Sequence, residues 1–136
     1  MPDTITITLP LPNKMLSPNH TVGSIGGRMA KAQAIKSYRQ NAWLATLASI
    51  AERSEFHQIQ AAQVTLVFYL PDKRRRDIGN LEASMKPAYD GLVDAGLIVD
   101  DDYLHLEHAQ STIEIDKGNP RVEITVTRVT HWWRLP

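Results

Sequence analysis

Two different spacings of apolar residues limit this chain to a fold that mixes helices and strands. Apolar residues recur at every second position in residues 4–9, 64–70 and 122–126, which is typical of half-buried strands. They recur every three or four positions in residues 29–52 and again in 78–95, which is typical of amphipathic helices. Because the two periods need different backbones, the chain is predicted to be α+β.

One more strand is predicted over residues 103–115, with a bulge or bend inside it because its apolar residues change parity. Turn residues at 116–120 follow, so this strand and the last one are predicted to form a hairpin. The predicted order is β-α-β-α-β-β, a mixed four-stranded sheet covered by two helices. A length of 136 residues suits one core, and residues 1–136 are expected to form a single domain.

The composition excludes several classes of protein. The chain has no cysteine, which rules out disulfides and thiolate metal sites. His105 and His108 are three apart on a predicted strand, which places them on opposite faces and argues against a zinc site. No apolar run is long enough to cross a membrane and no signal-peptide pattern is present, so a cytoplasmic protein without a membrane partner is expected.

The charges are unevenly distributed although the net charge is zero. Residues 1–76 carry ten Lys and Arg against four Asp and Glu, whereas residues 77–136 carry five against eleven. A basic surface beside an acidic pocket suits an enzyme that binds phosphates with one and a metal ion with the other. The alternative is that the asymmetry is accidental, which is a real alternative in so short a chain.

The charge boundary falls inside residues 74–102, the stretch that predicts the chemistry most directly. Its apolar residues recur three or four apart and form one stripe of a helix. Glu82, Lys86 and Asp90 are spaced by four, so they form a polar line on the same helix. Gly96 is expected to end this helix.

Carboxylates are predicted at both ends of this central helix. Asp77 stands at its start, while Asp100, Asp101 and Asp102 follow its end. The chain must fold back to bring the two groups together, and the apolar run at 97–99 is expected to anchor that return.

This stretch resembles the RusA family of Holliday-junction endonucleases. The family pattern is R-x-D-x-D-N-L, a helix with a lysine, a D-G-L or D-A-L step, A-G, an apolar run and D-D. The matching residues of this chain are Arg75, Asp77, Asn80, Leu81, Lys86, Asp90-Gly91-Leu92, Ala95-Gly96 and Asp100-Asp101. Leu16-Ser17-Pro18-Asn19 is also similar to an L-S-P-N step that follows the first strand in many members. The family's second aspartate is replaced here by Gly79.

The resemblance implies an endonuclease that cuts four-way DNA junctions as a homodimer and uses magnesium, with manganese as the alternative ion. Asp77 and Asp101 are the leading candidates for catalytic carboxylates that hold the ion, and Asp100 is a further metal ligand candidate. Lys86 resembles the family's catalytic lysine, which would stabilise charge that develops on the phosphate.

Gly79 leaves two interpretations open. Glu82 lies one helical turn further on, and its longer side chain is expected to reach the same ion as a metal ligand and catalytic group. Pro87 is expected to bend the helix nearby and tilt this turn towards Asp101. The alternative is a non-catalytic protein that binds DNA junctions and has lost cleavage. A third interpretation is a small interaction module in which Asp77 is only a helix cap and the other charges are solvated.

Basic residues near the two predicted helices are candidates for phosphate contact. Four adjacent cations between a strand and a helix repel one another and cannot be buried unpaired, so phosphate contact is favoured there. The glycine-rich loop at 13–28 is either a second DNA contact or a flexible surface loop. The predicted DNA-binding residues are Lys73, Arg74, Arg75, Arg76, Arg28, Lys31 and Asn19. The tryptophans of the 131–134 tail are expected to pack on the core or on a second subunit.

Overall fold

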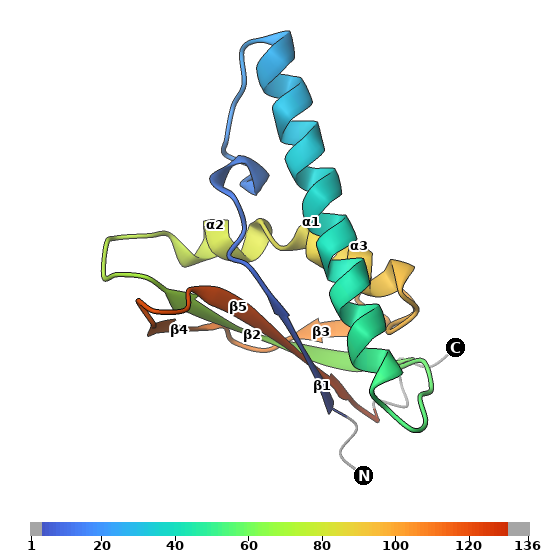
Figure 1. Ribbon diagram of the computed structural model, residues 1–136. Helices are drawn as coiled ribbons and strands as arrows, with labels where there is room; N and C mark the ends of the chain where they lie inside the picture. Colours follow the sequence, from blue (N-terminus) through green and yellow to red (C-terminus); the bar gives the residue numbers. More distant parts are fainter. Residues whose placement is uncertain (1–3, 131–136) are drawn as a thin grey trace.

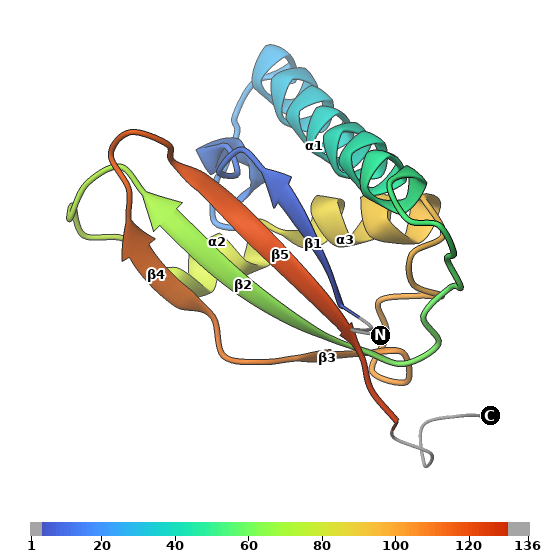
Figure 2. The same ribbon diagram turned by 60° about the horizontal axis from the view of Figure 1, so that its bottom comes forward.

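A mixed sheet is the central feature of the structure, a computed structural model that describes residues 4–130 (Figure 1). Within those residues the sheet has five strands: β1 (Thr4–Leu9), β2 (Ala62–Leu70), β3 (Leu106–His108), β4 (Thr112–Ile115) and β5 (Arg121–Arg128). β5 lies between β1 and β2 and is antiparallel to both. β3 and β4 follow one another along the other edge of β2 and are parallel to it (Figure 2). The prediction of a mixed sheet is confirmed, with five strands rather than four.

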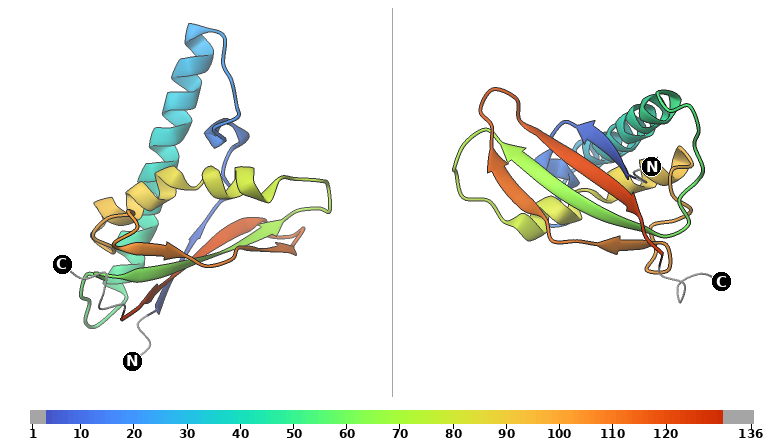
Figure 3. Two further views of the ribbon diagram at one scale, coloured as in Figure 1. Left: turned by 180° about the vertical axis from the view of Figure 1, so that it is seen from behind. Right: turned by 90° about the horizontal axis from the view of Figure 1, so that it is seen from below.

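The helices lie on one face of this sheet (Figure 3). They are the short 3-10 turn η1 (Lys14–Leu16), α1 (Ile25–Ala51), α2 (Ile78–Ala83) and α3 (Lys86–Asp94). α2 and α3 cross over the sheet, whereas α1 rises steeply from it, so that the N-terminal half of α1 stands clear of the strands (Figure 1). Among the described residues, no helix is long and apolar enough to span a membrane.

The core lies between the sheet and the helices. Ile7, Phe68 and Ile124 are fully buried, one from each of the three long strands. Buried and partly exposed positions alternate along all of these strands, as the two-residue period predicted. In the described part of the chain, the opposite face of the sheet has no helix on it (Figure 3). It carries a ladder of threonines, in which Thr4 contacts Thr127 and Thr6 contacts Thr125.

Two predicted helices have different limits in the structure. The first begins at Ile25 because the Ser24 hydroxyl caps it and accepts a hydrogen bond from the Gly27 N–H at 3.0 Å. The prediction of a single bent central helix is wrong. Ser84 and Met85 divide this stretch into α2 and α3. Pro87 lies in the first turn of α3, where its missing N–H costs no hydrogen bond.

The predicted hairpin at the C-terminal end is also wrong. β4 pairs with β2 and β5 pairs with β1 and β2, so the turn at 116–120 joins two strands that do not pair with each other. β5 has eight residues and a fully alternating buried face, so it can cover the whole length of β2. β4 is short and exposed, which suits the edge of the sheet. The calls on residues 131–134 lie outside the described residues.

Gly91 determines how closely α3 packs against α1, and Gly96 determines where α3 ends. Gly96 has a φ of 79°, and the N–H of Leu97 bonds back to the carbonyl of Leu92 at 3.1 Å, as in a Schellman motif. Gly91 lies against α1, where an added Cβ would be 2.5 Å from the Arg39 carbonyl oxygen and 2.7 Å from the Ala42 Cβ. The crossing of α1 and α3 therefore requires glycine at position 91.

We expect Gly91→Ala to lower the free energy of unfolding by about 1–3 kcal/mol, because the helices must separate to admit a methyl group. Gly26→Ala is the matched control. Gly26 lies in α1, and a Cβ added there would have no neighbouring atom within 4 Å. This control should leave the free energy unchanged or raise it by up to about 1 kcal/mol. Urea unfolding measures both, and a Gly91→Ala protein as stable as the parent would contradict the close contact.

Candidate active site

Two cavities in the described part of the chain are lined in part by α2. Different predicted site residues line each of them. The first, here called the Asp77 groove, has a volume of about 530 Å³ and lies between residues 11–20 and 70–84. The second, here called the Tyr89 pocket, has a volume of about 340 Å³ and lies between α2, α3 and the β3–β4 edge. Asp77 lines the groove and Glu82 lines the pocket.

Asp77 caps α2 and also faces the groove. Its Oδ1 accepts hydrogen bonds from the backbone N–H groups of Gly79 at 2.8 Å and Asn80 at 3.4 Å. Asn19 reaches the same place from the N-terminal loop, where its Nδ2 donates to Asn80 Oδ1 at 2.6 Å. The structure thus brings Asn19 and Asp77, predicted from distant parts of the chain, to one cavity.

In the basic run at 73–76, Arg76 has a structural role and the three residues before it are exposed. Arg76 is largely buried, pairs with the Asp72 carboxylate at 2.9 Å and donates to the carbonyl oxygen of Arg74 at 3.0 Å. The Arg74 N–H and the Arg76 guanidinium together hold the pKa of Asp72 below its usual value. Lys73, Arg74 and Arg75 are exposed, and Arg74 lines the groove beside Arg76.

The basic residues of α1 have two different environments. Lys31 is partly buried, and its Nζ donates to the backbone carbonyls of His20 at 2.8 Å and Ser17 at 3.4 Å. Lys31 therefore attaches the N-terminal loop to α1, a role the sequence did not suggest. Arg28 is exposed one turn earlier on the same helix.

Lys86 and Asp101 meet because the chain returns after α3. Leu97 and Ile98 are fully buried, and the Leu97 carbonyl accepts a hydrogen bond from the Ile59 N–H at 2.9 Å. This anchored return brings Asp101 Oδ2 to 2.5 Å from Lys86 Nζ, which also contacts Asp90 Oδ1 at 2.9 Å. The hydrogen bond with Asp101 is the main cause that raises the pKa of Lys86, so the ammonium form is stabilised.

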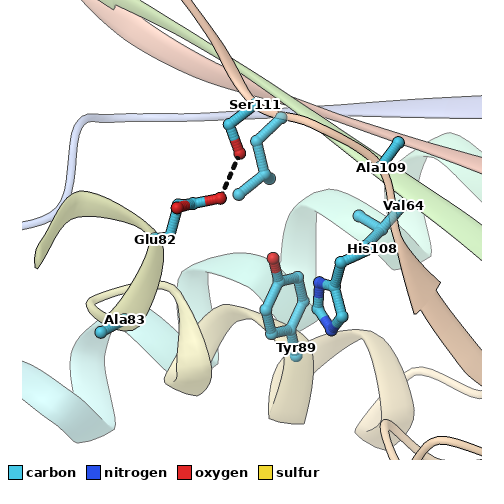
Figure 4. A pocket seen from close by; sticks show the side chains of 8 residues that line it. Val64, Glu82, Ala83, Tyr89, His108, Ala109 and Ser111 are labelled. Atoms are coloured by element: carbon cyan, nitrogen blue, oxygen red, sulfur yellow. Dashed lines mark hydrogen bonds between the residues drawn. The ribbon is translucent and has the colours of Figure 1, made fainter. Parts of the chain in front are cut away.

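Glu82 faces the Tyr89 pocket (Figure 4), and the ion pairs of Lys86 are with Asp90 and Asp101 instead. Its Oε2 accepts a hydrogen bond at 2.8 Å from the hydroxyl of Ser111, a residue that is 7% exposed. Burial raises the pKa of the Tyr89 phenol, and the charges of Glu82 and Asp101 raise it further.

The carboxylates of the described residues do not gather into one large metal site. Among residues 4–130, no group of three or more His, Asp or Glu side chains is placed to hold a metal ion. Asp100 is exposed, and its Oδ1 accepts the Asp101 N–H at 2.7 Å. Magnesium needs only one or two protein carboxylates besides water and substrate phosphate, so Asp101, which Lys86 holds, and Glu82, which lines the Tyr89 pocket, are each candidate ligands.

Three residues of the pocket were not recognised from the sequence: Tyr89, Ser111 and, except as a rejected zinc ligand, His108. The His108 ring lies edge-on to the Tyr89 ring, with centroids 5.4 Å apart and an interplanar angle of 68°. The change of parity in residues 103–115 was the available signal, because the break it marks contains Ser111.

Carboxylates, a lysine in contact with one of them and exposed arginines are groups that a nuclease uses to hydrolyse phosphodiester bonds. The comparisons with known proteins agree. A family model described as endodeoxyribonuclease RusA matches residues 12–127. The chain therefore belongs to the RusA family of endodeoxyribonucleases and is an endonuclease of the hydrolase class.

Individual relatives cover almost the whole chain. It is 29% identical over 129 residues to the crossover junction endodeoxyribonuclease RusA of Escherichia coli strain K12, which is 93% of this chain and 97% of that protein. The proteins of the same name from Escherichia coli O1:K1 and from O6:H1 strain CFT073 match to the same extent.

The two roles of Asp77 can be separated by substitution. Asp77→Asn keeps a good helix cap but removes the charge, whereas Asp77→Ala removes both. We expect only Asp77→Ala to lower the free energy of unfolding, by about 0.5–2 kcal/mol. If the carboxylate also serves the chemistry, both variants lose DNA cleavage by at least about tenfold. An Asp77→Asn protein that cleaves like the parent would limit Asp77 to its capping role.

Proposed function

We propose that this protein resolves four-way DNA junctions by paired hydrolysis of phosphodiester bonds, as a magnesium-dependent homodimer. The observation that carries the proposal is the contact of Lys86 with Asp101, in a chain whose relatives are named crossover junction endodeoxyribonucleases. A junction needs two matched cuts, and a two-fold symmetric dimer presents two identical sites. Such an enzyme acts on DNA in recombination and repair, in the cytoplasm.

In this proposal Glu82 and Asp101 hold the ion, with Asp77 and Asp100 as the further carboxylates at the site. Magnesium, or manganese in its place, would supply charge relief on the phosphate and a more acidic bound water. Lys86 holds Asp101 and Asp90 at 2.5 and 2.9 Å, so it keeps their carboxylates close without a metal ion. When the DNA phosphate arrives, the same ammonium stabilises the negative charge that develops on it.

The DNA backbone is proposed to follow the basic residues around the Asp77 groove. Lys73, Arg74 and Arg75 are exposed and near the start of α2, and Arg76 holds their loop through Asp72. Asn19 adds a side-chain amide from the other wall of the groove. Arg28 and Lys31 extend the basic surface along α1, with Lys31 acting mainly through the loop that it holds.

Incubation of the full chain with a synthetic four-way junction and magnesium tests the proposal. We expect paired nicks that disappear with a chelator, and binding that weakens as salt rises. Asp101→Asn should bind the junction but lose at least about tenfold in cleavage rate. Salt-dependent binding without nicks in any metal would favour a junction-binding protein that has lost cleavage because Gly79 replaces an acidic residue. Absence of binding would contradict both functions.

We expect Glu82→Gln to lower cleavage by at least about tenfold, a barrier change of about 1.4 kcal/mol, and to leave junction binding nearly intact. The reason is that the amide keeps the contact with Ser111 but loses the charge that would bind the ion. Glu114→Gln, which removes an exposed carboxylate of β4, is the matched control and should cleave like the parent. Single-turnover rates on a junction measure all three proteins.

Installing an acidic residue at position 79 should restore part of the rate lost in Glu82→Gln. A Cβ at Gly79 meets one heavy atom within 4 Å, Asp77 Oδ1 at 3.2 Å, so Gly79→Asp needs only a small shift of that carboxylate. A Glu82→Gln, Gly79→Asp protein no faster than Glu82→Gln alone would show that the two positions do not serve the same ion.

A further inference from the structure

The Tyr89 hydroxyl is a buried donor that has no hydrogen-bond partner among residues 4–130. Tyr89 is 7% exposed, and its hydroxyl points into the pocket towards the side of Glu82 (Figure 4). It makes no hydrogen bond to any of residues 4–130. A buried phenol almost always finds an acceptor, because leaving it without one costs the hydration it has lost. The hydroxyl therefore presents a hydrogen-bond donor to whatever group occupies the pocket.

The walls of the pocket restrict what that ligand is. Val64 and Leu66 are buried apolar residues of β2, and the Tyr89 and His108 rings form a further wall. The mouth is open, since Glu82, Ala83 and His108 are exposed. A volume of about 340 Å³ is at the small end of ligand cavities, which suits one small planar group.

The charge of a small group determines whether it is a suitable occupant of the Tyr89 pocket. Among the described residues, no Lys or Arg lines the pocket, so a backbone phosphate inside it would lose hydration without gaining an ion pair. A hydrated cation gains nothing from the apolar wall of Val64 and Leu66. A nucleobase is neutral, has a flat apolar face for aromatic side chains and carries ring nitrogens and carbonyl oxygens on its edge.

We propose that the Tyr89 pocket binds one unpaired nucleobase of the DNA, next to the strand that is cut. The Tyr89 hydroxyl donates to a ring nitrogen or carbonyl oxygen of the base, and His108 and Tyr89 pack against it. This inference rests on the proposed function, and it adds the DNA group that the enzyme holds beside its carboxylates. Bases at the branch point of a junction are the natural source, because unpairing them costs less than unpairing bases inside a duplex.

The test measures binding of the full chain to four-way junctions without divalent cations, so that the strands stay intact. In each junction one nucleotide near the branch point is replaced by an abasic residue. We expect one such position at which the wild-type protein loses about tenfold in affinity, most of it the hydrogen bond that the Tyr89 hydroxyl donates to the missing base. Tyr89→Phe should reduce this loss to below about threefold. Tyr38→Phe is the matched control, because the buried Tyr38 hydroxyl already donates to the Pro10 carbonyl at 2.7 Å.

Ala83→Phe provides a second test that does not touch the buried phenol. Ala83 is exposed on α2 at the mouth, so a larger side chain there should obstruct the pocket without disturbing the core. This variant should bind the intact junction as weakly as the wild type binds the critical abasic junction. Equal wild-type affinity for the intact junction and for every abasic one overturns the base pocket but not the proposed function. A wild-type protein that binds no junction at all overturns both.

Discussion

Burial of Leu97 and Ile98 holds the candidate active site together. Both side chains are fully buried, and Gly96, with its φ of 79°, allows the chain to turn into them directly after α3. The segment that follows is then held beside Lys86, which contacts Asp101 at 2.5 Å. Without this return the aspartates after α3 would be solvated loop residues. The apolar anchor therefore determines the chemistry, although it carries no functional group itself.

The Tyr89 pocket exists because two regular elements are interrupted at the same level of the structure. Ser84 and Met85 separate α2 from α3, and residues 109–111 separate β3 from β4. Glu82 lies just before the first break and Ser111 lies in the second, and their side chains meet at 2.8 Å. A continuous helix over a continuous strand would have filled this space with packed side chains. The irregular segments thus create both the cavity and the contact that orients Glu82.

Lys86 has the central place among the charges. It pairs with Asp90 one turn further along α3 and with Asp101 on the returning segment, so local and distant carboxylates share one ammonium. The Asp77 carboxylate instead accepts hydrogen bonds from backbone N–H groups at the start of α2. These two arrangements keep the carboxylates apart within one chain, which agrees with the absence of a three-residue metal cluster from residues 4–130. The family and the endonuclease class follow from the comparisons, while the ion and the dimer belong to the proposal.

The sequence by itself determined the features that depend on neighbours along the chain. The alternation in β1, β2 and β5, the Gly96 helix end and the anchoring by the apolar run at 97–99 were predicted, and the Asp77 cap was one of the interpretations left open. The tertiary structure decided which strands pair and which side chains meet. The pattern of β5 suits a hairpin with β4 as well as a place between β1 and β2, and Glu82 lies 29 residues from Ser111. Such contacts depend on how all the elements pack into one core, and no local spacing encodes that.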